Sequence, residues 1–146
     1  MSTPRIRYRE IAPNIFTALL GLEKVLAESL LEPSLRELVK VRASQLNGCA
    51  YCVDMHSADA LKAGETVRRL LSLPTWQETP FFTARERAAL LWTETLTLLA
   101  ERHAPDAIYA EVAEQFSERE LAELTFAIAT INAWNRIGVG LAMQPE

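Results

Sequence analysis

The sequence has few cysteines and histidines and no segment that would enter a membrane. Its 146 residues include only two cysteines and two histidines. Beyond Cys49 and Cys52 there is no second Cys-x-x-Cys pair, so a structural zinc site, which normally closes with four ligands, would be short of them. The chain has no uninterrupted apolar run of about 18 residues and no basic start followed by an apolar stretch. We therefore expect neither a transmembrane helix nor a signal peptide.

The chain also lacks an excess of positive charge. A net charge of −4 argues against a nucleic-acid-binding surface. No alternation of β-branched residues resembles a series of strands. A composition that is 49% hydrophobic and 23% charged is typical of a soluble globular protein, and we assign residues 1–146 to one all-α domain. With no export signal we expect a reducing cytoplasm, where a Cys-x-x-Cys is more often catalytic than structural.

Both cysteines lie in the stretch 34–64, which predicts a helical hairpin. Asn47-Gly48 is a strong helix stop, because glycine adopts the left-handed conformation at little cost. A helix over 34–47 would therefore be followed by a second helix over 49–62. If the two run antiparallel, Glu37 and His56 lie at similar depth, and we hypothesise that they are in contact.

The spacing of the thiols and His56 indicates redox chemistry. Cys49, Cys52 and His56 share one stripe of their helix. A thiolate is the reactive form of cysteine, and two features would favour it here: Cys49 lies at a helix N-terminus, and Cys52 has His56 one turn away. These features favour different cysteines, so the spacing leaves the nucleophile open. Two thiols this close can form a disulfide and reopen it, as a catalytic couple does.

The pattern Glu37-x11-Cys49-x2-Cys52-x3-His56 resembles the motif of the alkylhydroperoxidase AhpD group, within the carboxymuconolactone decarboxylase-like superfamily. The residues that flank the motif, and Ile-Asn-Ala-Trp-Asn-Arg-Ile at 131–137, are also typical of it. At position 51 the chain has tyrosine where some members have histidine.

The resemblance implies a thiol-dependent antioxidant oxidoreductase without a cofactor or metal. Cys52 would attack a hydroperoxide, Cys49 would resolve the product, and His56 and Glu37 would relay protons. The partners it implies are a small hydroperoxide and a thiol or dithiol reductant, which includes the possibility of a partner redox protein. The same cysteines would alternatively reduce a partner peroxiredoxin. The fold implied is all-α, assembled as a trimer or hexamer.

Other interpretations of these residues remain open. Ser34-x-x-Glu37 also fits a capping box, in which Glu37 would bind the backbone of Ser34. The cysteines would alternatively be buried small hydrophobic residues, or, with His56, three ligands of a zinc ion, for which His103 is a distant fourth candidate. A non-redox, decarboxylase-like member is disfavoured because such members lack the cysteine pair. A non-catalytic metal-binding or assembly protein is the last alternative.

The remaining segments predict further helices. Residues 1–12 are expected to be an extended arm or a disordered tail. Helices are predicted over 13–31, 66–73, 83–103, 105–116 and 118–142. In the helix 34–47 we expect Leu35, Leu38, Val39 and Leu46 to be buried, and Arg36 and Lys40 to point outward.

Two segments raise questions of packing. The connection 74–82 is rich in aromatic residues, and Trp76, Phe81 and Phe82 would pack beneath it, wall an apolar substrate pocket or fill a subunit interface. The helix 118–142 is apolar on most faces, so we expect it to be central or to lie at a subunit contact.

Overall fold

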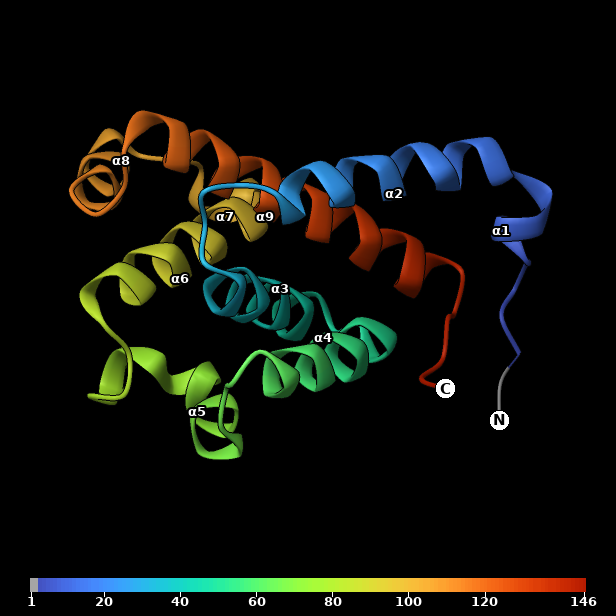
Figure 1. Ribbon diagram of the computed structural model, residues 1–146, viewed down its shortest axis with the longest axis horizontal. Coiled ribbons are helices and arrows are strands. Elements are labelled where there is room, and N and C mark those ends of the chain that lie inside the picture. Colours follow the sequence, from blue (N-terminus) through green and yellow to red (C-terminus); the bar gives the residue numbers. More distant parts are fainter. Residues whose placement is uncertain (1–2) are drawn as a thin grey trace.

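The computed structural model describes residues 3–146, and these form an all-α fold (Figure 1). Among the described residues there are nine α-helices and one 3-10 helix, and no strand. The predicted fold class is therefore confirmed. The helices are α1 (Tyr8–Ile11), α2 (Pro13–Ala27), α3 (Pro33–Asn47), α4 (Ala50–Lys62), α5 (Val67–Ser72), the 3-10 helix η1 (Leu73–Glu78), α6 (Ala84–Thr97), α7 (Leu99–Arg102), α8 (Asp106–Ala113) and α9 (Glu118–Gly140).

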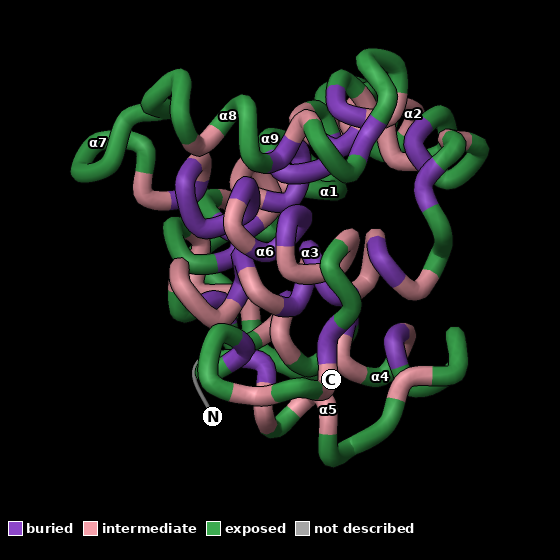
Figure 2. Tube along the Cα trace, turned by 90° about the vertical axis from the view of Figure 1, so that its left-hand side faces the viewer, coloured by how far each residue is buried: buried purple, intermediate pink, exposed green. Residues whose placement is uncertain are grey.

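Helix α3 lies at the centre of the molecule, with α4, α6 and α9 packed around it (Figures 1 and 2). Its two apolar faces belong to two clusters of buried side chains. Leu35 and Val39 pack with α6 and α9, whereas Leu38 and Val41 pack with α4, η1 and α6. A helix buried on two sides cannot shift without disturbing both clusters, so α3 is a rigid support for the residues it carries.

The helical hairpin forms as the sequence predicts. Gly48 ends α3 in the left-handed conformation, with φ +65°. Cys49 then takes the N-cap position of α4, which runs to Lys62. The side chain of Asn47 donates hydrogen bonds to Asn132 and Asn135 of α9, so the turn is also fixed to the longest helix.

The N-terminal segment differs from the prediction of an extended arm or disordered tail. Residues 1 and 2 lie outside the described part of the chain, but residues 8–11 form α1. The backbone N–H and the guanidinium of Arg5 bind the carbonyls of Leu141 and Gly140, each at 2.9 Å. These contacts join Arg5 to residues at the end of α9, far away in the sequence. Local periodicity therefore did not indicate an ordered segment.

Helix α2 ends at Ala27 rather than near residue 31. The guanidinium of Arg36 binds the carbonyls of Leu26, Ala27 and Leu31, and thereby satisfies the end of the helix. The prediction that Arg36 points outward was therefore wrong. Leu46, which was expected to be buried, is only partly buried.

The aromatic connection is packed rather than open. Residues 73–78 form the 3-10 helix η1, and Trp76 and Phe82 are buried, with Phe81 packed against the same cluster. The indole N–H of Trp76 donates to the buried carboxylate of Glu94 at 2.9 Å. Packing beneath the connection, one of the alternatives expected from the sequence, is therefore what the structure shows.

The predicted helix 83–103 is interrupted at Leu98. The capping box of Thr83 and Glu86 is present, but α6 ends at Thr97 and the short α7 follows. Leu99, the first residue of α7, is exposed. Helix α8 begins after Pro105 and ends at residue 113, three residues earlier than predicted.

The last helix is not buried on all sides. A capping box of Ser117 and Glu120 opens the helix, which ends at Gly140 rather than at 142. Phe126 and Val139 are 60% and 50% exposed in the single chain. None of the helices formed by residues 3–146 has the length and apolarity needed to cross a lipid bilayer.

Candidate active site

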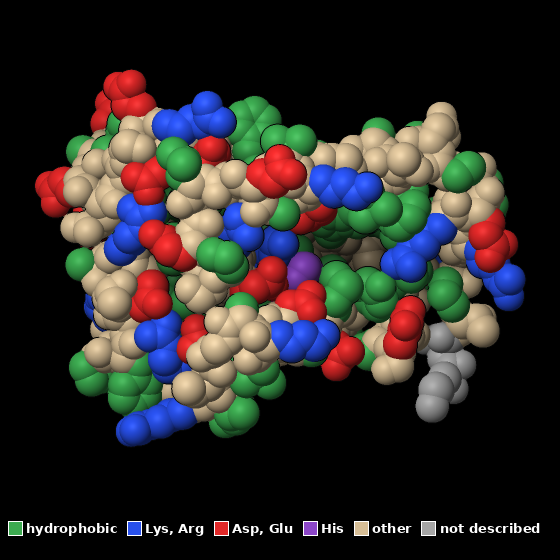
Figure 3. Space-filling model, viewed as in Figure 1, with side chains coloured by type: hydrophobic (Ala, Val, Ile, Leu, Met, Phe, Trp, Pro, Cys, Tyr) green, Lys and Arg blue, Asp and Glu red, His purple; other side chains and the backbone are tan. Residues whose placement is uncertain are grey.

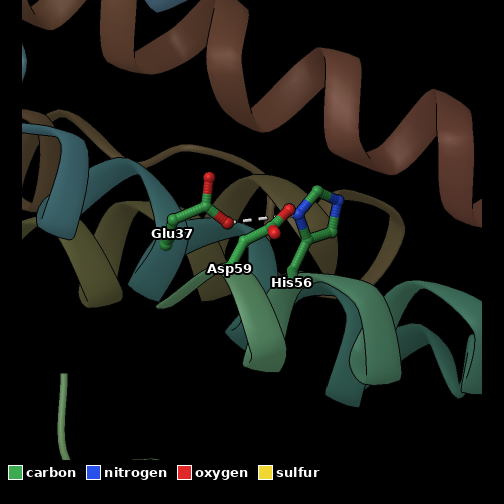
Figure 4. A group of neighbouring side chains, drawn as sticks. All are labelled: Glu37, His56 and Asp59. Carbon is green, nitrogen blue, oxygen red and sulfur yellow. Dashed lines mark hydrogen bonds and ion pairs between the residues drawn. The ribbon is translucent and has the colours of Figure 1, made fainter. Parts of the chain in front are cut away.

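The hairpin brings Glu37 of α3 against His56 of α4. The imidazole Nδ1 of His56 lies 3.2 Å from Oε2 of Glu37 (Figure 4). The hypothesis of this contact is therefore confirmed. The capping-box alternative was wrong: α3 begins one residue earlier, at Pro33, because proline suits a first helical position, so Ser34 is inside the helix and is not its cap.

A chain of polar contacts from four helices fixes Glu37. The indole N–H of Trp134 donates to Glu23 at 3.1 Å, and Glu23 pairs with Lys40 at 3.3 Å. Lys40 in turn lies 3.4 Å from Oε1 of Glu37. The prediction that Lys40 points outward was wrong, because its ammonium is held between the two carboxylates. The contacts leave Glu37 with one oxygen for Lys40 and the other for His56.

Glu37 is ionised at neutral pH. Its burial opposes the charge, but the hydrogen bond to His56 and the positive charge of Lys40 outweigh burial and hold the pKa of Glu37 below its ordinary value of 4.5. A carboxylate can only accept a hydrogen bond, so Nδ1 of His56 carries the proton in this contact. The other ring nitrogen points away from Glu37 and is the one available to accept a proton (Figure 4).

The two cysteines form a buried disulfide at the start of α4. Cys49 and Cys52 are bonded to each other and are 1% and 2% exposed. The Sγ of Cys49 also accepts a hydrogen bond from the backbone N–H of Cys52 at 3.3 Å, so a sulfur atom caps the helix. A helix N-terminus favours negative charge, and it would favour a thiolate here once the disulfide is reduced.

One glycine allows the disulfide to lie against α9. A Cβ atom on Gly138 would lie 2.8 Å from Sγ of Cys49 and 3.5 Å from Sγ of Cys52. The first distance is too short for ordinary contact, so any side chain at this position would collide with the sulfur. The absence of a side chain at residue 138 lets the sulfur pair approach the backbone of α9.

A cavity of about 440 Å³ opens beside this disulfide. Cys52 and His56 line it, whereas Cys49 does not. Its apolar wall is contributed mainly by Phe16, Leu20, Met55 and Trp134. Figure 3 shows the hollow between α2 and α4, with hydrophobic side chains in it. A small molecule in this cavity would meet the sulfur of Cys52 and not that of Cys49.

Helix α1 contributes polar groups to another part of the cavity wall. The guanidinium of Arg9 donates to the hydroxyl of Tyr51 at 2.9 Å and lies 5.1 Å from the centre of the Phe16 ring. Tyr8 packs edge-on against Phe16, which packs edge-on against Trp134. Tyr51, the position at which the chain departs from some AhpD members, thus lines the cavity and is bound to the N-terminal helix.

Glu37, His56 and Asp59 also form a group whose oxygen and nitrogen atoms lie within 4.8 Å of one another (Figure 4). The atoms of Glu37 are already in use, one with His56 and one with Lys40. A cation would have to replace the first contact and approach the ammonium of Lys40. The zinc alternative that used the cysteines would first require reduction of their disulfide.

The structure joins the predicted residues in two pairs, Glu37 with His56 and Cys49 with Cys52, and one member of each pair, His56 and Cys52, lines the same cavity. It adds residues that sequence reasoning missed, namely Arg9, Glu23, Lys40, Trp134 and Gly138. Only Gly138 carried a local signal, since a glycine inside a helix is unfavourable and often marks a close approach. Trp76, Phe81 and Phe82, the other aromatic candidates, do not line this cavity.

Comparison with known proteins identifies the class of this fold and site. Residues 13–95 match the carboxymuconolactone decarboxylase family. The chain is 41% identical over 137 residues to the uncharacterised protein YdfG of Bacillus subtilis, covering 94% of this chain and 93% of that protein. The chain therefore belongs to the carboxymuconolactone decarboxylase family, and it is an AhpD-like member of that superfamily.

Solved structures show the same fold. A protein of unknown function from Agrobacterium tumefaciens, provisionally described as an AhpD antioxidant defence protein, is 39% identical, with a TM-score of 0.95 over 99% of both chains. A peroxidase-related protein from Ralstonia eutropha, described as an alkylhydroperoxidase AhpD core, is 20% identical, with a TM-score of 0.83 over 94% of this chain and 74% of that one. The debrominase Bmp8, solved in complex with 2,3,4-tribromopyrrole, is 22% identical to this chain. Its TM-score is 0.80 over 94% of this chain and 73% of that one. At these lower identities the likeness is one of fold.

Proposed function

We propose that this protein is a thiol-dependent antioxidant oxidoreductase that reduces hydroperoxides through the Cys49–Cys52 couple. The observation that carries the proposal is the asymmetry of the pair: Cys52 lines the cavity beside His56, whereas Cys49 lies behind it. The geometry suits Cys52 as the attacking thiol and Cys49 as the resolving thiol. The description of the Agrobacterium protein as an AhpD antioxidant defence protein supports the same activity.

The reaction consumes one hydroperoxide and two thiols. The thiolate of Cys52 attacks the outer oxygen of the hydroperoxide, the O–O bond breaks, and the remaining oxygen leaves as an alcohol after it takes up a proton. Cys52 becomes a sulfenic acid. The thiol of Cys49 then attacks the sulfur of Cys52, the S–O bond breaks, and water leaves as the disulfide forms. An external dithiol restores both thiols and is itself oxidised to a disulfide.

His56 and Glu37 serve this reaction as a proton relay. The unprotonated ring nitrogen of His56 accepts the proton of the Cys52 thiol, directly or through water, and later returns a proton to the leaving oxygen. The ionised carboxylate of Glu37 orients the ring and stabilises the imidazolium that forms.

The second candidate is a disulfide reductant for a partner peroxiredoxin. The burial of both cysteines bears on this choice, since a folded protein surface does not reach residues that are only 1% and 2% exposed. A dithiol slender enough to enter the cavity reaches Cys52 more readily, so the structure favours a small hydroperoxide and a small reductant. We further propose that the enzyme works in the cytoplasm, where reductants keep such a couple active.

The test is a thiol count on the reduced, metal-free protein. Free thiols and intact mass are measured before and after one equivalent of cumene or tert-butyl hydroperoxide. We expect rapid loss of both thiols and of two hydrogens in mass, reversed by a dithiol. Thiols that react no faster than free cysteine would refute the peroxidase activity, and oxidation by a disulfide substrate alone would favour the second candidate.

A further inference from the structure

Arg9 differs from the other charged residues of the cavity in having no opposite charge beside it. Glu23, Lys40, Glu37 and His56 pair with one another in a continuous chain. Among residues 3–146, the polar contacts of the Arg9 guanidinium are with the hydroxyls of Tyr8 and Tyr51, and no carboxylate pairs with it. These contacts use only part of its donor capacity, because a guanidinium has five N–H groups.

The surroundings of Arg9 hold its guanidinium in place at the cavity. It lies against the aromatic rings of Phe16, Tyr8 and Tyr51, at 5.1, 5.9 and 6.0 Å from the three ring centres. Stacking on aromatic faces and hydrogen bonds to hydroxyl groups leave the positive charge intact while they fix its position. A planar guanidinium held in this way is suited to binding a carboxylate through two parallel hydrogen bonds.

The charged side chains around the cavity determine where an anionic group would bind, and the cavity also has an apolar wall. Near His56, the carboxylates of Glu37 and Asp59 would repel an anion, and Lys40 is already held by Glu23 and Glu37. Among residues 3–146, Arg9 is a cavity-lining cation without an ion pair, and it binds Tyr51, the chain neighbour of Cys52. Phe16, Met55 and Trp134 line the same cavity. The cavity therefore fits a molecule with an apolar or aromatic body and one anionic group directed at Arg9.

We propose that Arg9 is a specificity-determining residue and that the preferred substrates are compact organic hydroperoxides bearing a carboxylate. The carboxylate binds the guanidinium of Arg9, the body lies against Phe16 and Trp134, and the peroxide group reaches the sulfur of Cys52. The identity of the oxidant rests on the proposed peroxidase function, whereas the recognition of a carboxylate by Arg9 does not. Arg9 remains protonated throughout, since its hydrogen bonds to Tyr8 and Tyr51 raise its already high pKa.

The first experiment compares three hydroperoxides that share one body: cumene hydroperoxide, its para-carboxylate and the methyl ester of that acid. Disulfide formation in the reduced full-length protein is followed without any reductant, so a carboxylate on a reductant has no influence. We expect the acid to react about tenfold faster than the ester, as one charge-assisted hydrogen-bonded pair would produce. In Arg9→Gln the ratio of the rate with the acid to the rate with the ester should fall to about one.

Two further variants separate charge from structure. Arg9→Lys should keep part of the preference because it keeps the charge. Arg7→Gln removes the same charge from the residue that precedes α1, but Arg7 pairs with Glu10 and does not line this cavity, so the preference should persist. Equal rates for acid and ester in the wild type, or an unchanged preference in Arg9→Gln, would overturn the proposal. If Arg9→Gln slows the reaction of the acid and of the ester equally, Arg9 is a structural residue, and this result would also overturn the proposal.

A binding measurement tests carboxylate recognition by Arg9 even if no hydroperoxide reacts with the protein. Calorimetric titration of the oxidised protein would compare para-isopropylbenzoate with the uncharged para-isopropylbenzamide. We expect tighter binding of the benzoate by about tenfold in the wild type, and equal binding of both probes in Arg9→Gln. Equal binding in the wild type would refute carboxylate recognition. A normal reaction with cumene hydroperoxide alongside that result would leave the peroxidase function standing.

Discussion

Cys49 and Gly138 lie far apart in the sequence, yet the sulfur of Cys49 lies 2.8 Å from the position that a Cβ on residue 138 would occupy. The contact joins the start of α4 to the last turns of α9. It leaves no space for a methyl group unless the disulfide or the helix moves. Residue 138 is therefore as much a part of the site as the cysteines, although it carries no side chain.

Gly138→Ala should destabilise the protein by about 1–3 kcal/mol, the usual cost of forcing an extra group into a packed core. The loss is measured by urea unfolding of the oxidised protein. Gly140→Ala is the matched control, because a Cβ there meets nothing within 4 Å and alanine favours the helix. Equal stability of the two variants would show that the helix moves aside at little cost.

The cysteine variants should differ in kind and not only in degree. Cys52→Ser removes the thiol that faces the cavity, so hydroperoxide consumption should stop. Cys49→Ser should permit a single turnover and then accumulate a sulfenic acid on Cys52, because the resolving thiol is missing. Intact mass and a sulfenate-trapping reagent distinguish the two outcomes. Equal, mild losses in both variants would contradict the assigned roles.

Glu37→Gln tests the proton relay. Glutamine can still hydrogen-bond to His56, but it has no charge to fix the protonated nitrogen or to stabilise an imidazolium. We expect oxidation of Cys52 to slow by about tenfold to a hundredfold near neutral pH, within the range of a general acid–base contribution. Glu28→Gln, at an exposed residue that follows α2, serves as the control. An unchanged rate and pH profile would leave Glu37 a structural residue.

The same variant should change how stability depends on pH. The folded protein holds the pKa of Glu37 below its unfolded value, so the ionised carboxylate stabilises the fold. That contribution is complete above the ordinary pKa of 4.5 and is lost as the pH falls through the lower, folded value. Urea unfolding should therefore separate wild type from Glu37→Gln near neutral pH, and the two curves should converge in acid. A stability difference between wild type and Glu37→Gln that grows as the pH falls would contradict a lowered pKa of Glu37 in the folded protein.

The exposed apolar residues of helix α2 indicate that the protein associates with copies of itself. Only Leu26 among the 15 residues of α2 is buried in the single chain, and Ile15 and Val25 are 68% and 66% exposed. Exposed apolar surface of this kind usually marks a contact with another molecule. We propose that this face of α2 packs against a second copy of the chain, in the trimer or hexamer that the family resemblance implies. Ile15→Glu combined with Val25→Glu should lower the mass found by sedimentation. A wild type that sediments as a monomer would refute this.

The local signals of the sequence predicted the site well where few residues decide the backbone. Gly48 ends α3, Cys49 caps α4, and two capping boxes open α6 and α9, each within a few residues of its cause. The spacing of Glu37 and His56 along two predicted helices was enough to propose their contact, because helical rise fixes their depth once the turn is known.

The sequence alone therefore determined an all-α protein whose hairpin carries a Cys-x-x-Cys beside a histidine and a glutamate. Tertiary structure alone decided which cysteine faces the cavity, that Lys40 lies between two carboxylates, and that Arg9 returns to the wall beside Tyr51. Contacts of this kind join residues far apart in the sequence, such as Glu23 and Trp134, which are separated by 111 positions. Local periodicity and spacing carry no information about such pairs, because their meeting depends on how whole helices pack.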